Sequence, residues 1–198
     1  QALAAEPPVA SRGWDDWTAQ RHADYLENIQ PKPAPGEMNM SEVVAHLNEV
    51  LPADALVCNG AGNSTAWLHR HFQYRGFRTQ AAPTSGAMGY GVPAAIAASI
   101  IYPERDVVAV VGDGCFQMAL PEMGTAAQYG ATPVLIVVNN SMYGTIRMHQ
   151  EREYPDRVIG TELVNPDFVA LAHSYGWHSE RLTKTAEFAD AYARAKAS

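Results

Sequence analysis

Beyond residue 37, short apolar runs alternate along the chain with segments that have the periodicity of helices. VVAVV (107–111) and VLIVV (134–138) are apolar at every position, which predicts strands buried on both faces of a parallel sheet. Alternation of such strands with helices predicts an α/β fold, in which an open, mostly parallel sheet carries helices on both faces. The predicted strands are ALVCN (55–59), FRTQAA (77–82), DVVAVVGDG (106–114) and TPVLIVVNN (132–140).

Helices are predicted where apolar residues recur at helical spacing next to capping or breaking residues. Ser41 is the expected N-cap of SEVVAHLNEVL, and Pro52 closes this helix. Asn165 is the expected N-cap of NPDFVALAHSYG, with Pro166 in the first turn. TAEFADAYARAKA (185–197) is expected to be an exposed helix that runs to the end of the chain. The other predicted helices are STAWLHRHF (64–72), GYGVPAAIAASII (89–101) and LPEMGTAAQYG (120–130).

The first part of the chain differs in composition, and we interpret residues 1–37 as an interdomain linker with one short helix. WDDWTAQRHADYLENI (14–29) supplies the helix-forming residues, between Pro7-Pro8 and the cluster PKPAPG. Residues 38–198 are then one domain, since a chain of this length supports a single full hydrophobic core. The chain opens on a glutamine within polar, proline-spotted sequence, so we expect it to be an excised or processed fragment.

Composition and charge narrow the range of partners. Hydrophobic residues make up 47% of the 198 residues and charged residues 18%, which is ordinary for a globular protein. The net charge of -7 argues against a nucleic-acid partner. No run approaches the roughly 20 apolar residues of a membrane span, and the N-terminus lacks the pattern of a signal peptide. Two widely spaced cysteines, Cys58 and Cys115, predict reduced, buried thiols and a cytoplasmic protein.

Two polar turns follow apolar strands, at the place where open α/β sheets bind ligands. Gly112-Asp113-Gly114 ends one strand and Asn139-Asn140 ends the next, and the 24 residues between them suffice for a crossover helix. Either turn alone could be a plain strand end, but together they place carboxylate and amide oxygens at one edge of the sheet. Oxygen ligands of this kind, completed by substrate phosphates, suit Mg²⁺. The two turns together therefore predict a site for a metal-bound diphosphate.

The segment VVGDGCFQMALPEMGTAAQYGATPVLIVVNNSMYG (110–144) closely resembles the thiamine-diphosphate motif of the superfamily of acetolactate synthase, pyruvate decarboxylase and benzoylformate decarboxylase. The resemblance covers the chain from about Met38 onward and implies that thiamine diphosphate and Mg²⁺ are the cofactors. It implies that the metal ligands are the side chains of Asp113 and Asn140 and the backbone carbonyl of Met142. The same motif implies further cofactor contacts at Gly112, Gly114, Cys115, Tyr143 and Gly144.

Two further segments resemble cofactor loops of that superfamily. In APTSGAMGYG, the resemblance implies that the Gly86 carbonyl accepts a hydrogen bond from the aminopyrimidine and that Met88 supports the bent cofactor. In VCNGAGNSTAW, it implies diphosphate contacts at Gly62, Asn63 and Ser64. Without the resemblance, Met88 could be an ordinary core residue, and Asn63 or Ser64 a helix N-cap. A cap and an anion contact are compatible, because both use the N-terminus of the helix.

The resemblance also implies that part of the active site lies elsewhere. In the family, the glutamate that protonates the aminopyrimidine belongs to a pyrimidine-binding domain, of the same or a partner chain. No residue of this chain matches it, and Glu122 matches a structural position. We therefore expect this chain alone to be inactive, and the intact enzyme to be a homodimer or tetramer. Family members usually have a further apolar strand after the segment matching residues 187–198, so we expect the domain to be truncated at its C-terminus.

The substrate class follows from the resemblance alone, which implies 2-keto acids and acetolactate synthase-like decarboxylation and carboligation. His149 stands where acetolactate synthases usually have a tryptophan that shapes the substrate pocket. We consider His149 a candidate catalytic residue, since histidine exchanges protons near neutral pH, although a solvated surface histidine fits equally. A benzoylformate-type decarboxylase and the separate cofactor-binding subunit of a two-chain decarboxylase are the alternatives. The sequence leaves open which 2-keto acid reacts, whether a second substrate is used and whether FAD is required.

Overall fold

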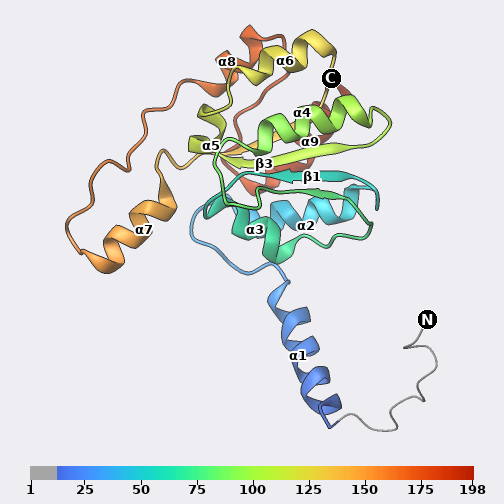
Figure 1. The fold of residues 1–198 in the computed structure, drawn as a ribbon, viewed down its shortest axis with the longest axis vertical. Helices are drawn as coiled ribbons and strands as arrows, with labels where there is room; N and C mark the ends of the chain where they lie inside the picture. The colour runs from blue at the N-terminus through green and yellow to red at the C-terminus, as the bar shows by residue number, and fades with distance from the viewer. Residues whose placement is uncertain (1–12) are drawn as a thin grey trace. The chain divides into compact units, whose positions relative to one another are not determined.

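Four parallel strands form the central sheet in the computed structural model, which describes residues 13–198. They are β1 (Leu56–Asn59), β2 (Gln80–Ala81), β3 (Val107–Gly112) and β4 (Val134–Val138), in the spatial order β2-β1-β3-β4. The register places Val108 beside Val57 of β1 and beside Val134 of β4. The predicted parallel α/β sheet is confirmed, and the carboxyl ends of β1, β3 and β4 lie at one edge of it (Figure 1).

Helices cover both faces of this sheet, because successive residues of a strand point to opposite sides. In β3, Val107, Ala109 and Val111 belong to one hydrophobic core, whereas Val108 and Val110 belong to a second. The first core includes residues of α4 (Gly91–Ile101), α5 (Asp113–Gln117), α6 (Glu122–Tyr129) and α8 (Phe168–Ser174). The second includes residues of α2 (Met40–Val50), α3 (Ser64–His71) and α9 (Phe188–Ala197). The short 3-10 helix η2 (Thr185–Glu187) precedes α9, and α7 (Gly144–Glu153) has no buried residue.

The chain divides into two compact units, residues 1–30 and residues 31–198. The described part of the first unit contains α1 (Asp15–Asn28), which matches the short helix predicted at residues 14–29. The cluster Pro7-Pro8 lies outside the described residues, and the linker role of residues 1–37 stays a prediction. In the second unit, Cys58 and Cys115 are buried free thiols, as predicted, and burial raises the pKa of the Cys58 thiol to about 12. Of the described helices, none is long and apolar enough to cross a membrane.

Both predicted helix caps are wrong. The N-cap of α2 is Asn39, whose side-chain oxygen accepts a hydrogen bond from the Ser41 amide at 3.0 Å, so Ser41 lies inside the helix. The N-cap of α8 is Asp167, whose carboxylate accepts from the amides of Val169 and Ala170. In each case a better-placed acceptor two residues away takes the cap position. The side chain of Asn165 is thereby free for other contacts.

Two predicted elements are shorter or more buried than expected. FRTQAA contributes only the two residues of β2, which pairs with the two central residues of β1, Val57 and Cys58. The C-terminal helix is not fully exposed, because one face of α9 carries the buried side chains of Phe188 and Tyr192. These aromatic rings pack beside His46 of α2 and close the second core.

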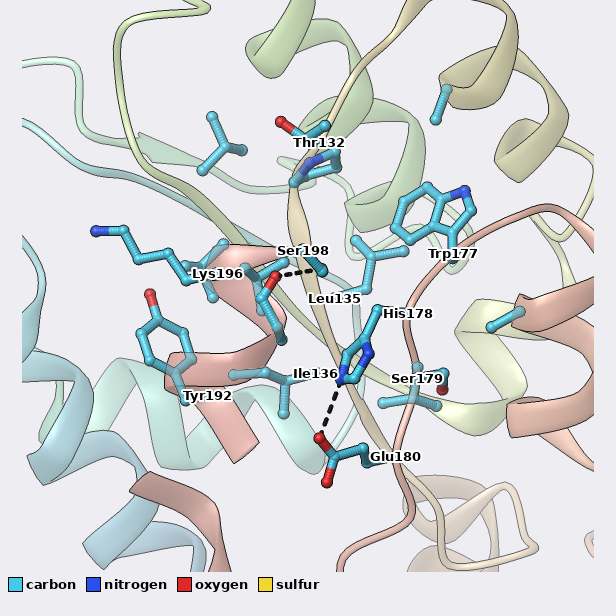
Figure 2. Close-up of a pocket in the computed structure, with 18 of the residues that line it drawn as sticks. Thr132, Leu135, Ile136, Trp177, His178, Ser179, Glu180, Tyr192, Lys196 and Ser198 are labelled. Atoms are coloured by element: carbon cyan, nitrogen blue, oxygen red, sulfur yellow. Dashed lines mark hydrogen bonds and ion pairs between the residues drawn. The ribbon is translucent and has the colours of Figure 1, made fainter. Parts of the chain in front are cut away.

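The expectation that VLIVV is buried on both faces is also wrong. All five residues of β4 are only half-buried, because β4 is an outer strand of the sheet. Beside it lies a hollow of about 1200 Å³, lined by β4, by residues 175–182 and by α9. Figure 2 shows Leu135 and Ile136 of β4 in this hollow, together with Trp177 and Tyr192.

Candidate functional site

Three turns meet at the carboxyl edge of the sheet, after β1, β3 and β4. The turn after β1 approaches the turn after β3, since a Cβ added at Gly112 would lie 3.1 Å from the Ser64 hydroxyl oxygen. The turn after β3 contacts the turn after β4, since the Ser141 amide donates to Asp113 Oδ2 at 2.8 Å. The predicted proximity of the GDG and NN turns is therefore present in the structure. The parallel register produces it, because Gly112 pairs with Val138 at the ends of β3 and β4.

Asp113 is the buried carboxylate at this edge, with only 2% of its surface exposed. It follows β3 directly and begins α5. Its Oδ2 accepts two hydrogen bonds, from the Ser141 amide at 2.8 Å and from Asn165 Nδ2 at 2.7 Å. Its Oδ1 has no hydrogen-bond partner within residues 13–198, yet it is not among the fully buried unpaired atoms. Asp113 thus presents one free carboxylate oxygen.

The turn after β4 is held by its own side chains. Asn139 Oδ1 accepts from the Ser141 amide at 3.1 Å, and Asn140 Oδ1 accepts from the Met142 amide at 3.2 Å. Ser141 has a φ of 55°, in the left-handed region, and its amide also donates to Asp113 Oδ2. The Met142 carbonyl accepts no hydrogen bond from the described residues, although Met142 forms an isolated bridge with Glu162. Asn140 Oδ1 keeps a second lone pair, so both oxygens can bind another group.

Asn165 is the residue of this site that the sequence did not reveal. It lies before α8, and its Nδ2 donates to both Asp113 Oδ2 and Asn139 Oδ1, at 2.7 Å and 2.8 Å. Its Oδ1 accepts from Gln117 Nε2 of α5. The N-P-D sequence resembles a helix start, so the local pattern predicts only a cap at Asn165. Only the tertiary structure shows that its side chain joins the GDG and NN turns.

Gly114 is a position at this edge where two side chains pack directly against the backbone. A Cβ added there would lie 2.7 Å from Tyr143 Cε1 and 3.2 Å from Met88 Cε. The structure thus brings together Gly114, Tyr143 and Met88, which lie in three separate segments of the sequence. Met88 also packs against the first hydrophobic core, so the functional and core interpretations of Met88 are compatible. Cys115, the next residue, donates its Sγ hydrogen to the Ala61 carbonyl at 3.2 Å.

The turn after β1 contacts the start of α7. Gly62 has a φ of 95°, and Asn63 occupies the N-cap position of α3 without a side-chain cap hydrogen bond. Instead, the Thr145 hydroxyl donates to Asn63 Oδ1 at 3.0 Å and accepts from the Asn63 amide at 3.0 Å. Asn63 is therefore the N-cap of α3, one of the two residues expected there, but its side chain bonds Thr145 of α7 in place of the helix amides. Gly86 lies in a separate exposed turn with a φ of 67° and open space around it.

His149 and Gly144 lie on α7. His149 is exposed, and its Nδ1 is 2.9 Å from Arg152 Nη2. This position agrees with a solvated surface histidine, and a role in the substrate pocket stays a prediction. Gly144 lies against the NN turn, since an added Cβ would be 3.2 Å from Asn140 Nδ2.

The oxygen atoms at this edge match the ligand preference of a hard divalent cation. Asp113 Oδ1, Asn140 Oδ1 and the Met142 carbonyl supply one charged and two neutral oxygens. Within residues 13–198, no group of three or more His, Cys, Asp or Glu side chains could hold a metal. A single carboxylate favours Mg²⁺ that is completed by ligand phosphates over a cation held by protein carboxylates alone. The large hollow along β4 includes Asn139 but none of these three ligand residues.

A parallel sheet with three ligand-accessible turns at its carboxyl edge defines an α/β cofactor-binding domain. Residues 60–198 match the family model described as thiamine pyrophosphate enzyme, C-terminal TPP binding domain. Acetolactate synthase large subunit of Parasynechococcus marenigrum is 36% identical over 176 residues, which cover 82% of this chain and 28% of that protein. The mitochondrial acetolactate synthase catalytic subunit of Aspergillus candidus is 35% identical and covers 89% of this chain and 27% of its own length.

A solved structure gives the same result. The thiamine diphosphate-dependent 4-hydroxybenzoylformate decarboxylase of Rhodococcus jostii superposes with a TM-score of 0.78 at 25% identity. The match covers 85% of this chain and 32% of that one. The chain therefore belongs to the thiamine pyrophosphate (thiamine diphosphate) enzymes and contains their C-terminal TPP binding domain. It spans less than a third of the length of the two acetolactate synthases, 28% and 27% respectively.

Proposed function

We propose that the carboxyl edge of the sheet binds Mg²⁺ and, through it, the diphosphate of thiamine diphosphate. The metal ligands are Asp113 Oδ1, Asn140 Oδ1 and the Met142 carbonyl. One observation carries this proposal: Asp113 Oδ2 is occupied by two hydrogen bonds, and Oδ1 is left free beside the NN turn. Because Oδ1 is also not among the fully buried unpaired atoms, it is accessible to an added cation.

The glycines and polar side chains of the turns surround the proposed diphosphate. Gly112 and Gly114 let the side chains of the neighbouring turns pack against the turn after β3, because an added Cβ at either position would lie within 3.1 Å of a neighbouring side chain. Gly62, Asn63 and Ser64, which follow β1, are further contacts of the diphosphate. Tyr143, Gly144 and the Cys115 amide complete the diphosphate contacts, and Gly86 and Met88 serve the pyrimidine end. When bound, thiamine diphosphate supplies the carbanion nucleophile and electron sink, while this chain holds and orients it.

For the whole protein we propose decarboxylation and carboligation of 2-keto acids, as the names of the acetolactate synthase relatives suggest. A pyrimidine-binding domain, of the same or a partner chain, completes the site in a cytoplasmic homodimer or tetramer. The second candidate is a simple decarboxylase of the benzoylformate type, supported by the superposition on a 4-hydroxybenzoylformate decarboxylase. The intact enzyme should release CO₂ from pyruvate or another 2-keto acid. Formation of a condensed product would distinguish the synthase from the decarboxylase.

Calorimetry with thiamine diphosphate and Mg²⁺ tests the cofactor site. The Asp113→Ala and Asn140→Ala variants should lose metal-dependent binding, with the larger loss for Asp113→Ala because it removes the only charged ligand. Asn48→Ala is a matched control, since Asn48 also bridges two backbone groups at 2.8 Å but lies away from the turns. Undiminished binding by Asp113→Ala would show that the metal assignment is wrong.

A further inference from the structure

We infer that Asn165 is a positioning residue that holds the Asp113 carboxylate in a monodentate orientation and thereby favours Mg²⁺ over Ca²⁺. This inference rests on the proposed metal site and adds a determinant of its ion selectivity. Asn165 is not itself a metal ligand in this arrangement. It acts through the hydrogen bond of 2.7 Å that its Nδ2 donates to Asp113 Oδ2.

The orientation of the Asn165 amide is fixed by its three partners. Nδ2 faces two acceptors, Asp113 Oδ2 and Asn139 Oδ1, and each takes one of its two hydrogens. Oδ1 faces the donor Nε2 of Gln117. A flipped amide would place its oxygen against two acceptors and its nitrogen against a donor. The hydrogen-bond network therefore permits only the observed orientation.

The backbone on either side of Asn165 holds it in place. Pro166 restricts Asn165 to an extended conformation. Asp167 is anchored as the N-cap of α8, through hydrogen bonds to Val169 and Ala170 at 2.9 Å and 3.3 Å. α8 in turn packs on the first core through Ala172. The donor to Asp113 is thus fixed to the body of the domain.

The hydrogen bond from Asn165 determines how the Asp113 carboxylate can bind a cation. Asp113 Oδ2 already accepts from the Ser141 amide and from Asn165, which uses both of its lone pairs. A bidentate carboxylate must present both oxygens to the ion, so it would have to break the Asn165 hydrogen bond. Mg²⁺ requires near-octahedral geometry and accepts a single oxygen, whereas Ca²⁺ accommodates bidentate carboxylates readily. Holding Oδ2 away from the ion therefore disfavours Ca²⁺.

The test titrates the chain calorimetrically with Mg²⁺ and, separately, with Ca²⁺, in the presence of the same excess of thiamine diphosphate. Asn165→Ala should weaken Mg²⁺ binding roughly 10-fold or more, the range for loss of a residue that orients a metal ligand. Ca²⁺ binding should weaken much less, so the ratio of the two affinities falls. Asn48→Ala, the matched control, loses a comparable pair of hydrogen bonds and should keep the ratio. Thermal unfolding of all variants without ligand checks that their stabilities are similar.

A second variant, Asn165→Asp, keeps the size of the side chain and removes both donors, so the Mg²⁺/Ca²⁺ ratio should fall here as well. An equal loss of affinity for both ions in Asn165→Ala would mean that the residue only stabilises the fold, and the inference would be wrong. An unchanged ratio in both variants would also overturn it. If the folded wild-type chain binds neither ion with thiamine diphosphate, the proposed cofactor site itself fails. If the wild-type chain binds the ions and the variants bind them with the same affinities, only the role of Asn165 is contradicted.

Discussion

At the scale of single residues, Gly114 shows how closely the turns of the site are packed. The Tyr143 ring and the end of Met88 occupy the volume that a side chain at this position would need, with 2.7 Å and 3.2 Å to an added Cβ. We expect Gly114→Ala to reduce the free energy of unfolding by about 1–3 kcal/mol, the usual cost of overpacking. Binding of thiamine diphosphate should weaken too, because the added methyl group keeps the cofactor further from the backbone of Gly114. Urea denaturation and calorimetry measure the two effects.

Gly124 provides the control for that substitution. It lies in α6, and an added Cβ would be in ordinary contact with Tyr175, at 3.4 Å. Gly124→Ala should therefore raise the free energy of unfolding by about 0.5 kcal/mol, since alanine loses less backbone freedom in a helix. Cofactor binding should not change. A Gly114→Ala variant as stable as Gly124→Ala would show that Tyr143 and Met88 move aside at little cost.

The residues of the site differ in how far the sequence could predict them. Asp113 and Asn140 are recognisable because each follows an apolar strand within a specific motif, and strand order brings their turns together. Asn165 is not recognisable, because its role depends on a contact across 52 residues of sequence. Locally, its place before Pro166 and Asp167 resembles a helix cap. The sequence also does not show that Asp113 Oδ1 has no hydrogen-bond partner among the described residues, because this depends on the tertiary hydrogen bonds that occupy Oδ2.

At the scale of elements, helix α9 is attached to the segment that precedes it by a charged pair. Arg194 Nε and Nη2 donate to the two oxygens of Glu180, each at 2.7 Å. His178 lies 3.0 Å from the same carboxylate (Figure 2). The hydrogen bonds from Arg194 first, and from His178 second, lower the pKa of Glu180 to about 2. This pair connects two sides of the hollow beside β4.

The shift of the Glu180 pKa predicts a pH-dependent stability. Because the folded pKa is lower than the unfolded value of about 4.5, the contribution of Glu180 is fully present above that pH. It is lost as the pH falls from about 4.5 through about 2. Glu180→Gln should therefore lower the urea midpoint at pH 6, and the difference from wild type should shrink toward pH 2.5. Glu153→Gln, at an exposed pair of adjacent residues on α7, is the control. A midpoint difference that is the same at both pH values would contradict the prediction.

The elements that the sequence predicted best are those with strong local signals. β3 and α4 lie close to their predicted bounds because their apolar runs are long and bordered by polar residues or turns. β2 is shorter than FRTQAA because Arg78, with a φ of 57°, interrupts the extended backbone, and only Gln80 and Ala81 form strand pairs with β1. The caps of α2 and α8 were predicted wrongly because each helix start has several polar residues close together. Which of them becomes the N-cap depends on the backbone geometry. The sequence pattern does not contain that geometry.

At the scale of the whole molecule, the sheet is incompletely covered along its outer strand β4. An apolar run such as VLIVV identifies a strand, but it does not reveal where that strand lies in the sheet. β4 proved to be an outer strand, so its residues are half-buried and border a hollow of about 1200 Å³. The apolar side chains exposed in this hollow can bind apolar probes.

We therefore expect the dye ANS to bind in the hollow, with a rise in its fluorescence at about one molecule per chain. Trp177 lines the hollow and should transfer excitation energy to the bound dye. Trp177→Phe should remove most of this transfer, because energy transfer declines steeply with distance. Trp67→Phe is the matched control, since Trp67 lies on α3 and packs against the second core outside the hollow. The fluorescence must be compared in the fully folded chain, because partly unfolded states also bind ANS. Equal transfer in both variants would place the bound dye elsewhere and would mean that the side chains around β4 close the hollow in solution.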